Sequence, residues 1–131
     1  KPLSQRWARL HAQAIAKKLK PYLDKLGELI QQAAGDLRSD KQSVLLTNAS
    51  CFLNVFSSCV VSWIWLRQAN VAEQALTQGA KGQDVDFYEG KLAAAEYFLS
   101  WELPLVQRDI EVLSSKDTTC DSVKAAYFWD S

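Results

Sequence analysis

Residues 42–66 read QSVLLTNASCFLNVFSSCVVSWIWL, a run of 25 residues without a charge between Lys41 and Arg67. A membrane-spanning helix needs about 20 predominantly apolar residues, so the length alone would allow a span. The composition is different, because polar residues recur along the run at three- and four-residue steps, which is helical spacing. These are Ser43, Thr47, Ser50, Asn54, Ser57 and Ser58. We therefore predict a soluble helical segment over about residues 41–78, buried on most sides, with no membrane span; a membrane-associated bundle is the alternative.

Apolar residues at helical spacing also predict helices on both sides of this segment. The first helical stretch runs from Leu3 to Ala33, and Pro21 marks either a kink in one helix or a junction of two. Residues 78–83 contain two glycines and no apolar periodicity, which predicts a loop. The next helix is expected from Asp84 to Leu113, with a kink at Pro104.

A last helix is expected to begin at Thr118 or Thr119, with Val123, Ala126 and Tyr127 on one face. No stretch alternates apolar and polar residues over the length of a strand, and only 5 Gly and 3 Pro occur in 131 residues. The predicted fold class is all-α: one domain over residues 1–131, an antiparallel bundle of about four helices, kinked near Pro21 and Pro104. The chain opens on Lys1 and has no Met, so we expect it to be a C-terminal part of a longer polypeptide, produced by processing or by cloning.

The formal charge of zero conceals an uneven distribution along the chain. Residues 1–40 carry eight Lys/Arg against four Asp/Glu, whereas residues 84–131 carry four against ten. The two regions could attract each other across the bundle or face separate partners. The overall balance excludes a generally basic nucleic-acid binder, so no nucleic-acid partner is expected.

Residues with catalytic or metal-binding potential do not form a recognisable constellation in the sequence. His11 is the single histidine, and no Glu-x-x-His motif follows Glu89 or Glu96, as a di-iron bundle would require. The glycines of the loop lack the spacing of a phosphate-binding motif. We therefore expect no catalytic, cofactor-binding or metal-binding residue in this chain.

The three cysteines, Cys51, Cys59 and Cys120, form no CxxC pair. Cys51 and Cys59 would lie about 12 Å apart along one helix, too far for a disulfide. Free thiols in a reducing compartment are the interpretation we favour, and the expected location is cytoplasmic.

Several aromatic residues are candidates for contacts with another domain or subunit. Tryptophan and tyrosine contribute a large buried area with few rotamers to order, which suits them as interface anchors. The candidates are Trp63, Trp65, Tyr97, Phe98 and Trp101. The competing interpretation is that they form the internal packing between helices.

Two runs of sequence resemble a known family. The run DFYEGKLAAAEYFLSWELPLV (residues 86–106) resembles the tail of certain acyl-CoA dehydrogenases, in which a helix with a lysine, alanines, an aromatic pair and a Leu-Pro step closes an additional C-terminal helical domain. The run FLNVFSSCVVSWIWLRQANVAEQAL (Phe52–Leu76) is similar to the long helix of that domain. The resemblance covers roughly residues 43–113 and rests on small and apolar residues.

The resemblance implies that this chain is an accessory, non-catalytic C-terminal domain of an FAD-dependent enzyme. Such enzymes remove hydrogens from the α and β carbons of an acyl-CoA thioester. The catalytic glutamate and the main FAD contacts belong to upstream domains. The implied partners are therefore the catalytic domains of the parent chain and further copies in a homo-oligomer. The alternative from another class is an independent helical adaptor that binds a partner through its acidic third helix.

Overall fold

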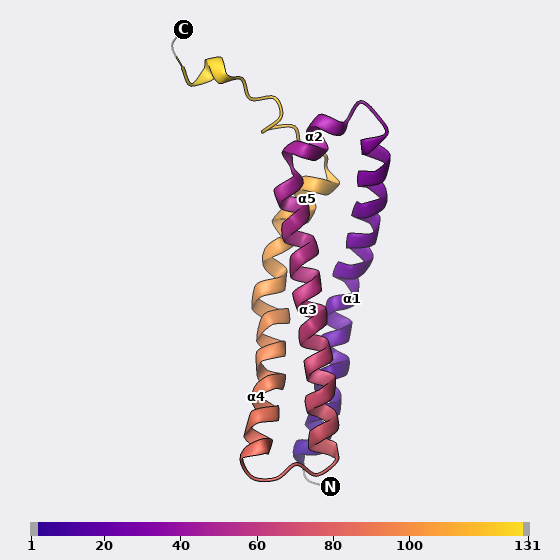
Figure 1. Cartoon of the computed structure of the whole chain (residues 1–131), viewed down its shortest axis with the longest axis vertical. Helices are drawn as coiled ribbons and strands as arrows, with labels where there is room; N and C mark the ends of the chain where they lie inside the picture. Colours follow the sequence, from indigo (N-terminus) through magenta and orange to yellow (C-terminus); the bar gives the residue numbers. More distant parts are fainter. Residues whose placement is uncertain (1–2, 130–131) are drawn as a thin grey trace. The chain divides into compact units, whose positions relative to one another are not determined.

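A computed structural model describes residues 3–129 of the chain, and its side chains from His11 to Trp129. Five α-helices follow one another, and the described residues contain no β-strand (Figure 1). They are α1 (Leu3–Leu37), α2 (Gln42–Thr47), α3 (Ala49–Thr77), α4 (Gln83–Tyr97) and α5 (Gln107–Ser114). The all-α prediction is therefore confirmed.

The chain divides into two compact units, and α1 and α3 each contribute residues to both of them. The first unit consists of the residues up to Asp24 together with Ser57–Leu105. The second unit consists of Lys25–Phe56 together with the residues from Val106 onward.

The first unit packs three helical segments against one another, and α3 runs antiparallel to both α1 and α4 (Figure 1). The Lys18 ammonium donates to the Ser100 hydroxyl over 2.8 Å, which links α1 to the segment that follows α4. The Lys91 ammonium of α4 lies 5.8 Å from the Trp65 ring of α3. Buried apolar side chains from all three segments fill the space between them: Ile15, Leu19, Cys59, Ala69, Ala72, Leu92, Ala95, Leu99 and Leu103.

The second unit combines a small apolar core with polar contacts between segments that are distant in sequence. The Gln32 side-chain amide donates to the Leu113 carbonyl over 2.9 Å, and the Lys116 ammonium lies 2.9 Å from the Asp36 carboxylate. The buried Asn48 amide donates to the Asp117 carbonyl, also over 2.9 Å. Asn48 is the residue at which α2 ends and α3 begins, so the predicted segment 41–78 is interrupted where this side chain is buried.

Pro21 lies inside α1, so of the two alternatives at this position the structure contains one continuous helix. The pyrrolidine ring removes the hydrogen bond that residue 21 would donate to the preceding turn. The remaining turns on either side continue, and Pro21 itself is exposed to solvent.

Pro104 has a larger effect, because the helical geometry changes around it. After α4 comes a π-helical turn, Phe98–Glu102, then a 3-10 turn, Leu103–Val106, and only then α5. The Leu103 N–H donates to the Phe98 carbonyl, an i→i+5 bond that widens the turn just before the proline. The predicted kink at Pro104 therefore takes the form of a π-helical turn followed by a 3-10 turn, and the predicted helix from Asp84 to Leu113 consists of four successive elements.

The loop between α3 and α4 is as predicted, and two of its residues require glycine. Gly79 and Gly82 have positive φ angles of 94° and 62°, which L side chains rarely adopt. The prediction of a last helix from Thr118 is wrong. Beyond α5 the described chain forms turns and a single 3-10 turn, Ala125–Tyr127, in which every side chain is exposed. Val123 and Tyr127 are 48% and 65% exposed, so within the described part of the chain the apolar face that would stabilise a helix is left largely uncovered.

The prediction that the segment around α3 is buried on most sides is also wrong. Within the described residues, α3 is the one helix long and apolar enough to cross a membrane, and 17% of its most apolar 18 residues are buried in the protein. Length and composition alone do not distinguish a membrane span from a helix that offers an apolar face to another protein. Exposed apolar residues lie along much of its length: Leu53, Phe56, Val60, Val61, Trp63, Ile64 and Val71.

Candidate interaction surface

A groove on the first unit lies between α3 and α4. Its volume is about 380 Å³, within the range of sites that bind small molecules. Helix α3 supplies Ile64, Arg67, Gln68, Val71 and Ala72 to its lining, and α4 supplies Phe87, Tyr88 and Lys91. None of these eight residues is acidic.

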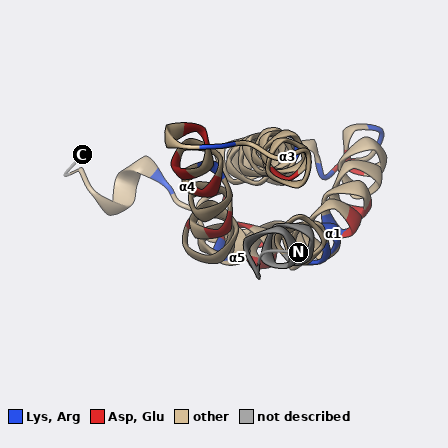
Figure 2. Ribbon diagram, turned by 90° about the horizontal axis from the view of Figure 1, so that it is seen from below, with Lys and Arg blue, Asp and Glu red and all other residues tan. Residues whose placement is uncertain are grey.

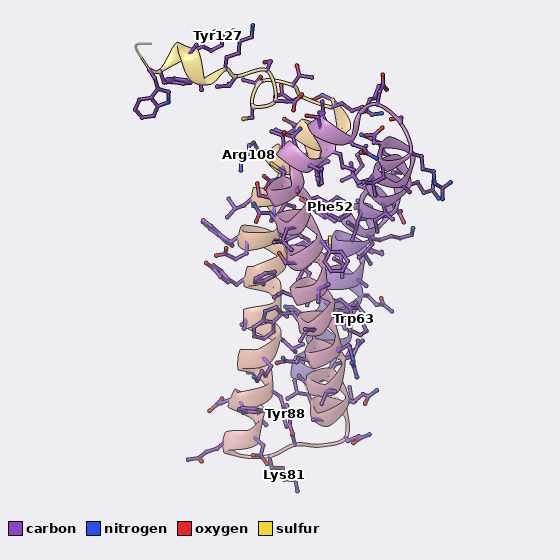
Figure 3. All side chains as sticks on the ribbon, turned by 45° about the horizontal axis from the view of Figure 1, so that its top comes forward. Phe52, Trp63, Lys81, Tyr88, Arg108 and Tyr127 are labelled. Atoms are coloured by element: carbon purple, nitrogen blue, oxygen red, sulfur yellow. The ribbon has the colours of Figure 1, made fainter. Side chains whose placement is uncertain are left out.

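Two cations lie at this groove, and each is positioned over aromatic rings. The Arg67 guanidinium lies 5.1 Å from the Trp63 ring, one turn earlier on α3. The Lys91 ammonium lies 5.4 Å from the Phe87 ring on its own helix and 5.8 Å from the Trp65 ring across the groove. Such contacts are worth about 0.5–1 kcal/mol at exposed sites, enough to bias the position of a long side chain. Trp63 and Tyr88 are labelled in Figure 3.

The five predicted interface residues fall into two groups. Trp63 and Trp65 flank the groove through their contacts with Arg67 and Lys91. Tyr97, Phe98 and Trp101 lie at the end of α4 and in the π-helical turn that follows it.

The second group is an exposed aromatic cluster. The Tyr97 and Trp101 rings are stacked, with centroids 6.4 Å apart and planes inclined by 19°. Tyr97 is 53% exposed and Trp101 71% exposed, while Phe98 is half-buried. The Tyr97 hydroxyl donates to the Glu102 carboxylate over 2.8 Å, and this hydrogen bond raises the pKa of the tyrosine. Trp101 is thus largely exposed and Trp63 is 49% exposed, so neither ring is fully enclosed by the internal packing.

The basic first third and the acidic last third of the chain make few direct pairs. In the first unit, the His11 imidazole lies 3.2 Å from the Glu96 carboxylate of α4. In the second unit the charges are reversed: the acid, Asp36, comes from the first third of the chain, and the base, Lys116, comes from the last third. The other acidic residues of α4, namely Asp84, Asp86 and Glu89, are exposed, and Figure 2 shows the red segments gathered on this helix.

No group of three or more His, Cys, Asp or Glu side chains capable of holding a metal ion occurs among the described residues. A second cavity, in the second unit, has a volume of only about 20 Å³, which is room for about one water molecule. The groove on the first unit is thus the larger of these two sites.

The cysteines of the described chain are free thiols in three different environments. Burial raises the pKa of Cys59, a residue of the first unit. Burial also raises the pKa of Cys51 in the second unit, and the hydrogen bond with the Asp109 carboxylate adds to this increase. Cys120 is exposed in the C-terminal segment.

The groove was not predicted from the sequence, although its two cationic residues, Arg67 and Lys91, lie in or beside the stretches discussed above. Arg67 ends the uncharged run, and Lys91 belongs to the run DFYEGKLAAAEYF. The missing information was that α3 and α4 place these two residues on one groove. The available signal was an aromatic residue one turn before each cation, Trp63 before Arg67 and Phe87 before Lys91.

The fold and the surface define a small helical domain with an apolar, partly cationic surface and no assembled metal site among its described residues. Residues 3–123 match the family described as acetyl-CoA dehydrogenase C-terminal like, and the chain belongs to this family.

The chain is also similar to the broad-specificity linear acyl-CoA dehydrogenase FadE5 of Mycobacterium tuberculosis (strain ATCC 25618 / H37Rv). The two are 38% identical over 77 residues, which cover 59% of this chain. The same alignment covers 13% of the relative, so the chain corresponds to a small part of that protein's length.

Proposed function

We propose that this chain is the accessory C-terminal helical domain of an FAD-dependent acyl-CoA dehydrogenase. In this role it supplies no catalytic group and instead provides packing contacts to the catalytic domains and to further copies in an oligomer. The exposed aromatic cluster of Tyr97 and Trp101 is the observation that carries this proposal. Large exposed apolar surfaces on small proteins are characteristic of interaction sites.

The flavin is assigned to the catalytic domains and not to this chain. A pyrophosphate is commonly bound by the backbone N–H groups at a helix N-terminus. At the junction of the loop with α4, the first helical turn carries Asp84 and Asp86, whose negative charge would repel phosphate. The first turn of α4 therefore does not suit a flavin pyrophosphate, and the proposed role includes no flavin chemistry.

A reducing, cytoplasmic setting belongs to the same proposal. The free thiols of Cys51, Cys59 and Cys120 are consistent with it, because thiols exposed to an oxidising compartment tend to form disulfides.

The test uses the natural polypeptide that carries this chain. We expect it to contain FAD, to reduce a dye in the presence of an acyl-CoA and to sediment as an oligomer. The double substitution Tyr97→Ser/Trp101→Ser should lower the sedimenting mass while the flavin absorbance per chain remains unchanged. Tyr127→Ser, which removes an exposed aromatic residue outside the cluster, is the matched control and should leave the mass unchanged.

Two results would contradict the proposal. Stoichiometric binding of FAD to the 131-residue chain alone would place the cofactor in this domain. A natural polypeptide without acyl-CoA-dependent dye reduction would favour the adaptor, in which the exposed acids of α4 contact a partner.

A further inference from the structure

The groove between α3 and α4 combines three properties that together specify a kind of ligand. Its walls contain apolar and aromatic side chains from both helices, including Ile64, Val71 and Phe87. Its two charged residues, Arg67 and Lys91, are both cationic. Its volume of about 380 Å³ corresponds to a small organic molecule.

The two cations are available to an anion. Within the described residues, the recorded contacts of Arg67 and Lys91 are with aromatic rings, and no carboxylate pairs with either side chain. An anion that enters the groove would therefore not have to displace an existing ion pair. The acids nearest in sequence to Lys91, namely Asp86, Glu89 and Glu96, are absent from the lining.

The aromatic contacts also reduce the cost of binding. Lys91 lies between Phe87 on its own helix and Trp65 on α3, and Arg67 lies over Trp63. Side chains that are already ordered lose less rotational freedom when they bind a ligand. A guanidinium and an ammonium beside an apolar wall can hold an anionic headgroup while the wall covers an apolar body.

We propose that this groove binds an amphiphile with a single anionic headgroup, with Arg67 and Lys91 at the headgroup and Ile64, Val71 and Phe87 along its apolar body. Gln68 and Tyr88 also line the groove and add an amide and a hydroxyl to its polar groups. This site goes beyond the proposed packing role and does not depend on it.

The experiment titrates the 131-residue chain with decanoate, decyl phosphate and decyltrimethylammonium, each below its critical micelle concentration, and with decanol below its solubility limit. Tryptophan fluorescence reports binding, because Trp63 and Trp65 contact the two cations. Equilibrium dialysis gives the stoichiometry. We expect saturable binding of decanoate at one site per chain, and at least tenfold weaker binding of decanol and of decyltrimethylammonium. The affinity ratio of decanoate to decyl phosphate identifies the preferred headgroup.

Substitutions then assign the headgroup contact. Arg67→Gln/Lys91→Gln should weaken decanoate binding at least tenfold, whereas Arg67→Lys/Lys91→Arg, which keeps both charges, should retain most of the affinity. Lys81→Gln removes an exposed lysine outside the lining and should bind as the unmodified chain does. Circular dichroism checks that every variant is helical.

The proposal is overturned by any of three results. These results are an absence of saturable decanoate binding, binding of decanol as tight as that of decanoate, or an unchanged affinity for decanoate in Arg67→Gln/Lys91→Gln. If decanoate does not bind and Arg67→Gln/Lys91→Gln lowers the sedimenting mass of the natural polypeptide, the groove is a protein contact only.

Discussion

The three cysteines illustrate how a single residue's environment decides its chemistry. The thiolate is the reactive form of cysteine, so a raised pKa lowers reactivity at a given pH. Burial holds the pKa of Cys59 above its ordinary value of 9.0, and burial with a hydrogen bond to Asp109 does the same for Cys51. Cys120 is exposed.

We therefore expect a thiol reagent at pH 8 to modify Cys120 first, Cys51 more slowly and Cys59 only when the chain opens. The native state holds the Cys59 proton to a higher pH than the unfolded chain does. The protonated Cys59 thiol therefore makes its full contribution to the free energy of unfolding below pH 9.0, the ordinary pKa of cysteine. This contribution is lost as the pH rises through the raised pKa of Cys59 in the folded chain. Mass spectrometry of timed reactions at pH 7, 8 and 9 measures the order, and guanidinium should make the three rates equal. Equal rates at Cys59 and Cys120 in native buffer would contradict the assignment.

At the scale of elements, α1 contains two residues that weaken it. Pro21 lacks the N–H of an interior helical residue. Gly27 is exposed, and outside its own stretch of helix backbone no atom lies within 4 Å of the position a Cβ would occupy. Proline costs about 3 kcal/mol relative to alanine inside a helix, and glycine about 1 kcal/mol.

Because α1 is continuous through both positions, Pro21→Ala and Gly27→Ala should each stabilise the chain. We expect increases in the free energy of unfolding of about 1–3 kcal/mol for Pro21→Ala and about 0.5–1 kcal/mol for Gly27→Ala. Urea denaturation followed by circular dichroism measures both. If two helices met at Pro21, the alanine would bring no gain, whereas Gly27→Ala would still stabilise the second helix.

The elements that could be predicted are those set by local chemistry. Apolar spacing located α1, α3 and α4, and the glycines at 79 and 82 located the loop. The break at Asn48 could not be predicted, because its partner, the Asp117 carbonyl, lies 69 residues away.

Tertiary packing also explains the remaining differences. The C-terminal segment has apolar residues at helical spacing, yet Val123 and Tyr127 remain exposed, so periodicity alone did not make a helix. Of the candidate surface, sequence provided the aromatic residues, while the groove required knowledge of how α3 and α4 pair. Neither Arg67 nor Lys91 is distinctive until the two helices are placed together.

At the scale of the whole chain, the question is what the exposed apolar residues of α3 contact. A lipid bilayer or a protein surface could cover these residues. Only a membrane span would require α3 to give up its contacts with the rest of the chain. To span a bilayer, α3 would have to leave the contacts that bury Val55, Cys59 and Ser62. It would also have to place Asn54 and its neighbouring serines in hydrocarbon, where polar groups are costly to bury.

We therefore expect the 131-residue chain to remain in the aqueous fraction when it is centrifuged through a density gradient with phospholipid vesicles. Val61→Glu tests this expectation further, since Val61 is 38% exposed and lies near the middle of α3. A charged residue at the bilayer centre costs about 2.5–3.5 kcal/mol, so this substitution would strongly weaken flotation if α3 spanned the bilayer. It should change nothing if the chain never floats. Flotation of the unmodified chain that is lost in Val61→Glu would show that lipid covers this face. An aqueous chain whose natural polypeptide loses oligomeric mass on Val61→Glu would show that protein covers it instead.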